Sequence, residues 1–170
     1  GFVYVDTGAI FGSVGSYAYQ RGVDPSDAVA VEALLPEIQL EILYREDGLQ
    51  HMILNGQDVT KEIRLPEISM YASRVSAIPA VRAFLLEMQR EMARTHSVIM
   101  DGRDIGTVVL PQADVKLFLT ASAEDRARRR YLELEERGTP EPYEKLLEEM
   151  KERDANDTAR AAAPLRPAED

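Results

Sequence analysis

The sequence predicts an α/β protein in which buried parallel strands alternate with helices. Three short apolar runs predict the strands, at Phe2–Val5, Ser97–Met100 and Val115–Leu119. The second run has no polar alternation, which is typical of a strand buried on both faces of a parallel sheet. Apolar residues at helical spacing between these runs predict the helices.

We expect helices over residues 9–20, 27–35, 66–75, 79–95, 123–137 and 143 to about 155. Ser26 and Ser122 are predicted to cap the second and the fifth of them. Pro79 suits the first turn of the fourth, where a missing N–H costs nothing. A parallel sheet covered by helices therefore accounts for most of the chain.

A small antiparallel unit interrupts this pattern. Residues 38–44 and 51–54 mix apolar and polar positions, and Glu46-Asp47-Gly48 lies between them as a turn. This arrangement predicts a β-hairpin, and Asn55-Gly56 predicts a second tight turn after it. We expect an antiparallel insertion in the parallel core.

Composition excludes several classes of protein. The net charge is −10, from 30 acidic and 20 basic residues, which argues against a general binder of nucleic acid or acidic membranes. The chain has no cysteine, and its two histidines have no ligand-like spacing, so we expect neither disulfides nor a protein-built metal site. With no signal peptide and no membrane-length apolar run, the expected location is the cytoplasm.

Charged residues gather where the predicted strands and helices end. Asp101-Gly102-Arg103-Asp104 directly follows the apolar run 97–100, where ligands bind in open α/β sheets. The candidates of this kind are Arg82, Arg103, Asp104, Arg129, Arg130, Arg153, Asp157 and Arg160. Converging arginines bind phosphate and stabilise a transferring phosphoryl group, although each arginine taken singly is more typical of a solvated surface charge.

Thr7 has two interpretations. Asp6-Thr7-Gly8 lies between a predicted strand and a predicted helix. Thr7 could cap that helix, or its hydroxyl and the free amides of the first turn could bind an anion. The residues alone leave both open.

Five segments of the sequence resemble bacterial cytidylate kinases, which are P-loop nucleoside monophosphate kinases. They are VDTGA (5–9), LNGQDVTKEIR (54–64), SRVSAIPAVR (73–82), DGRDIGTVV (101–109) and RDANDTAR (153–160). NGQDVT and DGRDIGTVV are specific to this family among nucleotide kinases. The resemblance implies phosphoryl transfer from ATP, with Mg²⁺, to CMP or dCMP in a monomeric enzyme.

The resemblance also implies a division of the chain and a role for each candidate. Residues 1–36 and 79–170 would form a P-loop kinase core with a helical lid at about 122–155, and residues 37–78 the monophosphate-binding insertion. CMP or dCMP would be held by Thr7, Ser73, Arg82, Arg103, Asp104, Asp157 and Arg160. Arg129, Arg130 and Arg153 would act with Arg103 on the transferring phosphoryl group, and Asp101 would lie near the water shell of Mg²⁺.

Two departures from the family modify these expectations. The chain contains no G-x-x-x-x-G-K-S/T sequence, which binds the phosphates of ATP, and we expect a core without its first strand and P-loop. Kinase activity near background would follow, and the alternatives are a non-catalytic nucleotide-binding fragment or one that dimerises through unpaired strand edges. In addition, Gly12 stands where the family usually has an arginine that reaches the CMP phosphate.

Overall fold

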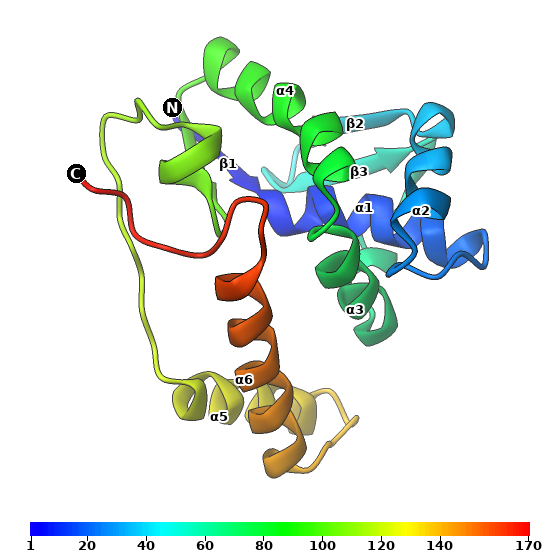
Figure 1. Cartoon of the computed structure of the whole chain (residues 1–170), viewed down its shortest axis with the longest axis vertical. Helices are drawn as coiled ribbons and strands as arrows, with labels where there is room; N and C mark the ends of the chain where they lie inside the picture. The colour runs from blue at the N-terminus through cyan, green and yellow to red at the C-terminus, as the bar shows by residue number, and fades with distance from the viewer.

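The computed structural model describes residues 1–170 and contains two small sheets packed with helices. Figure 1 shows α1 at the centre of the larger part, with α5 and α6 side by side at the opposite end of the molecule. The elements are β1 (Val3–Asp6), α1 (Thr7–Gln20), α2 (Ala28–Leu34), β2 (Leu40–Tyr44), β3 (Gln50–Leu54), β4 (Gln57–Asp58), α3 (Pro66–Val75), α4 (Pro79–Thr95), β5 (Val98–Asp101), the π-helical turn η3 (Ile105–Val109), α5 (Ala123–Glu136) and α6 (Tyr143–Ala159). Short 3₁₀ turns lie at Leu35–Glu37 (η1) and Glu62–Arg64 (η2). No helix is both long and apolar enough to cross a membrane.

The parallel part of the fold is the pair of strands β1 and β5, whose prediction is confirmed. Their register sets Asp6 opposite Asp101, so two carboxylates end neighbouring strands at the same edge. The expected burial on both faces is wrong, because Tyr4 and Ile99 are 52% and 58% exposed. One face of this two-stranded sheet contributes Val5 to the hydrophobic core, where residues of α1 also lie.

The predicted strand at Val115–Leu119 is also wrong. These residues form no strand, and Val115, Leu117 and Leu119 are 75–95% exposed. In Figure 1 the chain between η3 and α5 runs alone, without a sheet beside it. An apolar run becomes a strand only where a neighbouring edge accepts its backbone hydrogen bonds, and the local pattern does not reveal that edge.

Helix starts agree with the sequence to within two residues, since α1 begins at Thr7 and not at Ala9, and two caps differ from those predicted. Ser122 accepts a hydrogen bond from a first-turn amide of α5, as predicted. Asp6, and not Thr7, caps α1 through its carboxylate, and Asp27, and not Ser26, caps α2 in the same way. Both carboxylates stand next to the expected hydroxyl in sequence, and carboxylates are at least as good at this position.

The antiparallel insertion is confirmed as a three-stranded sheet in the order β2-β3-β4. Tyr44 pairs with Gln50 at the hairpin end. The turn between β3 and β4 uses positive φ at Asn55 (49°) and Gly56 (82°), as a two-residue hairpin turn requires. The two turns that connect the strands of this sheet therefore lie where the sequence predicted them.

The core is organised by α1, which packs on α3 at very short range. A Cβ added at Gly15 would lie 2.7 Å from the Ala72 nitrogen. Seventeen buried apolar residues from α1 to α4 and both sheets form one cluster. Helices α5 and α6 instead share a separate small cluster of Ala127, Leu134 and Leu146.

Candidate active site

The carboxyl ends of β1 and β5 open into a polar pocket of about 180 Å³. It is closed by the starts of α1 and α4, by α3, by the turn after β5 and by the end of α6. The predicted site residues that line it are Thr7, Ser73, Arg82, Asp101, Arg103, Asp104, Arg153, Asp157 and Arg160. Residues as distant in sequence as Asp6 and Arg160 thus meet in one cavity.

A buried ion pair forms one wall of the pocket. Nη2 of Arg82 lies 2.5 Å from Oδ2 of Asp104, and the two side chains are only 11% and 5% exposed. Arg82 also donates to the Ser76 carbonyl at 2.8 Å and stands over the ring of Phe11 at 4.9 Å. These three contacts hold the Arg82 guanidinium in place. The ion pair thus presents a hydrogen-bond donor, Arg82, beside an acceptor, Asp104.

Asp157 is the centre of a second charged cluster. Its carboxylate lies 3.0 Å from Nε of Arg103, 3.3 Å from Nη1 of Arg160 and 4.0 Å from Nε of Arg153. The carboxylate is 7% exposed, so three guanidiniums share one buried negative charge. The cluster has an excess of positive charge.

Arg160 is the most deeply placed of these cations. Burial, and then the charge of Arg82, lower the pKa of the Arg160 guanidinium. Its Nε donates to the Ala163 carbonyl at 2.8 Å, while its Nη2 is buried with no hydrogen-bond partner. A buried donor without a partner is rare in proteins, and here it belongs to a residue that lines the polar pocket.

The strand-end turn is held by hydroxyl groups. Thr7 donates to the backbone oxygen of Asp101 at 2.6 Å, and the Tyr4 hydroxyl donates to Oδ2 of Asp101 at 2.7 Å. Partial burial and this bond raise the pKa of Tyr4 to about 12. A Cβ at Gly102 would lie 2.4 Å from Oγ1 of Thr7, which explains why this turn has glycine after its first aspartate.

The structure does not bring Arg129 and Arg130 to the pocket. Both lie on α5, where Arg129 is exposed and Arg130 pairs with Glu133 at 3.4 Å. Arg126 of the same basic run pairs with Asp154 of α6. A role of Arg129 and Arg130 in phosphoryl transfer stays a prediction.

Sequence reasoning missed two residues that shape the site. Phe11 and Ser76 line the pocket, and both contact Arg82. Phe11 follows Thr7 by four positions in α1, so helical spacing alone places them on one face. That spacing was a signal available in the sequence, whereas the Ser76 carbonyl contact depends on how α3 meets α4.

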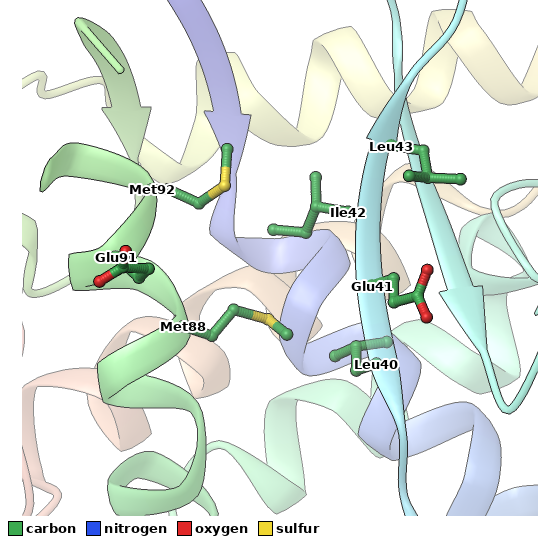
Figure 2. Close-up of a pocket in the computed structure, with 7 residues that line it drawn as sticks. All are labelled: Leu40, Glu41, Ile42, Leu43, Met88, Glu91 and Met92. Carbon is green, nitrogen blue, oxygen red and sulfur yellow. The ribbon is translucent and has the colours of Figure 1, made fainter. Parts of the chain in front are cut away.

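A second, larger pocket of about 430 Å³ lies between β2 and α4. Figure 2 shows Leu40 and Ile42 pointing from β2 toward Met88 and Met92 of α4, with Glu91 at the margin. Its lining contains no arginine or lysine. Apolar walls with carboxylates beside them repel phosphate, so the polar pocket is the better candidate for a phosphorylated ligand.

Comparison with known proteins gives a consistent result. The family model described as "Cytidylate kinase" matches residues 1–170. Three proteins named cytidylate kinase are 49%, 47% and 47% identical to this chain; they come from Caldicellulosiruptor bescii, Solibacter usitatus and Pelotomaculum thermopropionicum. These alignments cover 100% of this chain and 75%, 72% and 75% of the relatives. Since the match extends over every element that builds the arginine-rich pocket, the chain belongs to the cytidylate kinase family.

Proposed function

We propose that the protein transfers the γ-phosphoryl group of ATP to CMP or dCMP and that the polar pocket binds the nucleoside monophosphate. Family membership and the printed names of the relatives support this activity. The single observation that supports the site is the convergence of Arg82, Arg103, Arg153 and Arg160 on one cavity. Arginine forks match phosphate oxygens bidentately, and the unpartnered nitrogen of Arg160 lacks just such an acceptor.

The buried Arg82–Asp104 pair is proposed to recognise the base, together with Ser73. Asp104 can accept from the exocyclic amino group of cytosine, and Arg82 can donate to a neighbouring ring acceptor. Uracil carries an oxygen in place of that amino group, which would face the carboxylate with like polarity. A preference for cytosine follows from the chemistry of this pair.

The phosphate and the sugar would lie on the other side of the pocket. Arg103 and Arg160 are proposed to bind the phosphate, Thr7 to lie beside it, and Asp157 to hold the sugar. Asp157 already orients both arginines. Binding a dianion would supply the negative charge that the cluster around Asp157 lacks.

ATP and Mg²⁺ are expected as for the family. Mg²⁺ usually keeps several waters and takes one or two carboxylates together with phosphate oxygens, and when bound it neutralises charge on the transferring group. No three-residue cluster in the structure could hold a metal alone. Asp101 ends β5 at the pocket, and it is the residue proposed to face the water shell of the ion.

Two parts of the chain, the antiparallel insertion and the helix pair α5–α6, have proposed roles in this scheme. Residues 37–78 would be the monophosphate-binding insertion, since they contain the antiparallel sheet and Ser73 on α3. Helices α5 and α6 would be the lid, since they have their own apolar cluster and contribute Arg153 to the pocket. Arg103, Arg129, Arg130 and Arg153 would then neutralise the transferring phosphoryl group as the lid closes.

Calorimetric titration with CMP, dCMP, UMP and AMP tests the binding site. We expect CMP and dCMP to bind, and UMP and AMP to bind about 5- to 150-fold more weakly, since one lost polar contact costs about 1–3 kcal/mol. Arg103→Met should weaken CMP binding by about tenfold or more, because hydrogen bonds to charged groups contribute about 1.5–3 kcal/mol. Arg94→Met, on the exposed side of α4, is the matched control. Absence of both heat and thermal shift with CMP would refute the assignment.

A coupled assay of ADP release with CMP tests the transfer itself. The 170 residues contain no G-x-x-x-x-G-K-S/T sequence, so we expect them to turn over near background when assayed alone. Turnover in the ordinary kinase range of roughly 1–100 per second would contradict that expectation while supporting the proposed reaction.

A further inference from the structure

Arg90 of α4 contacts the turn that carries the site, although it does not line the pocket. Its Nε donates to the Val109 carbonyl at 3.1 Å and its Nη2 to the Val108 carbonyl at 3.0 Å. These carbonyls close the π-helical turn η3 (Ile105–Val109). The last carbonyls of a helical turn have no partner within it, so the guanidinium satisfies two groups that would otherwise be unpaired.

Asp104 directly precedes this turn, and its backbone is hydrogen-bonded to the end of the turn. The backbone oxygen of Asp104 accepts from the amides of Val108 at 2.9 Å and Val109 at 3.2 Å. Val108 and Val109 therefore each make two contacts. Their carbonyls accept from Arg90, and their amides donate to the backbone oxygen of Asp104. One hydrogen-bonded step separates Arg90 from a wall of the pocket.

Side chains of helix α4 thus bind the turn at both of its ends. Arg82 binds the Asp104 carboxylate where the turn begins, and Arg90 binds the carbonyls where it ends. The two arginines are eight residues apart, or about 12 Å along a helix. Because π-turns are intrinsically less favourable than α-helix, an external support of this kind decides how precisely the turn is held.

We propose that Arg90 is a positioning residue for nucleoside monophosphate binding. It sets the angle at which Arg103 and Asp104 enter the pocket, and it contacts no ligand itself. This inference rests on the proposed function of the polar pocket. It assigns to Arg90 a role that its exposed ion pair with Glu87, at 3.7 Å, would not have.

Arg94 provides the matched control. It lies one turn further along α4 and pairs with Glu87 at 3.0 Å and Glu91 at 2.8 Å. Its hydrogen bonds go to these two side chains and not to η3. Loss of Arg94 removes surface ion pairs alone, whereas loss of Arg90 also frees the turn.

The test compares Arg90→Met, Arg90→Lys and Arg94→Met by CMP titration and by amide hydrogen exchange. Arg90→Met should weaken CMP binding about tenfold and speed exchange at Val108 and Val109, while amides of α2 exchange as before. Arg90→Lys keeps the positive charge but carries all its donors on one nitrogen, so it cannot reach both carbonyls as the guanidinium does. Its CMP affinity and its exchange rates should therefore lie between those of wild type and Arg90→Met. Arg94→Met should match wild type in both measurements.

The possible outcomes separate this inference from the proposed function. CMP affinity within about twofold of wild type in Arg90→Met would overturn it, as would an equal loss in Arg94→Met. Were Arg90→Met not to fold, Arg90→Lys decides, since wild-type affinity and exchange in that variant would also overturn the inference. If the wild-type protein binds no CMP, the proposed function fails and the role in substrate binding fails with it. Exchange at Val108 and Val109 then decides whether Arg90 holds the turn at all.

Discussion

Removal of the Asp104 carboxylate should be among the most destabilising polar substitutions in the protein. Asp104→Leu keeps the branching and the number of side-chain heavy atoms but leaves the Arg82 guanidinium, 11% exposed, without its counter-charge. Breaking a buried pair from one side costs about 3–5 kcal/mol. Arg82 keeps the Ser76 carbonyl and the Phe11 ring, so the lower end, about 3 kcal/mol, applies. At this chain length about 2–4 °C of Tm accompanies each kcal/mol, so Tm should fall by about 6–12 °C.

Thermal unfolding followed by circular dichroism measures this loss against a matched control. Asp154→Leu removes the partner of Arg126 from a pair whose side chains are 27% and 35% exposed, and solvent limits its cost to about 1 kcal/mol. The double variant Arg82→Met with Asp104→Leu should recover most of the stability, because no buried charge is left unpaired. It should not recover CMP binding. Equal Tm losses in Asp104→Leu and Asp154→Leu would refute the argument from burial.

Three further predictions concern other parts of the fold. Gly15→Ala should destabilise the protein by about 1–3 kcal/mol through overpacking, because its Cβ would lie 2.7 Å from a backbone nitrogen of α3; chemical denaturation should show a smaller effect for Gly12→Ala, whose Cβ would meet a side chain at 3.3 Å. Hydrogen bonds to two carboxylates, Asp47 first, raise the pKa of His51, so its protonated form stabilises the fold below the unfolded pKa of about 6.5 and this stabilisation is lost as pH rises through the raised value. The Tm difference between wild type and His51→Gln should therefore be larger at about pH 5.5 than at about pH 9, and the opposite slope would contradict the argument. Ser122→Ala removes the hydrogen bond that caps α5 and should cost about 1 kcal/mol in denaturant unfolding, so unchanged stability would show that the cap contributes nothing.

Local sequence predicted the elements whose boundaries depend on local chemistry. Pro66 and Pro79 fix the starts of α3 and α4, and both helices have the predicted limits. The apolar run at Val115–Leu119 failed because strand formation requires a neighbouring edge, which is a property of the fold and not of the run. Burial failed for Tyr4 and Ile99 for the same reason, since a strand's second face is covered only where another layer packs on it.

The site was more predictable than the sheet because its residues mark the ends of elements. Asp101 and Arg103 follow an apolar run directly, and a parallel sheet gathers such ends at one edge. Distant arginines such as Arg160 could be assigned to the same pocket only through the family resemblance, since no spacing rule connects the end of α6 with β5. The contact of Arg90 with η3 lay beyond both kinds of inference, because it depends on carbonyl groups that every residue possesses.

The cluster around Asp157 has three guanidiniums to one carboxylate, and this local imbalance favours an anionic ligand. Each of these guanidiniums lies within 4.0 Å of the Asp157 carboxylate, and like charges gathered around one group repel one another. Burial is the first cause of the lowered pKa of Arg160, and the charges of Arg82 and Arg103 lower it further. In the proposed binding mode a phosphate dianion would relieve this repulsion and supply an acceptor to the unpartnered nitrogen of Arg160. Hydrogen bonds between charged groups are the stronger ones, so on the proposed binding mode the phosphate rather than the base should supply the larger share of the binding free energy.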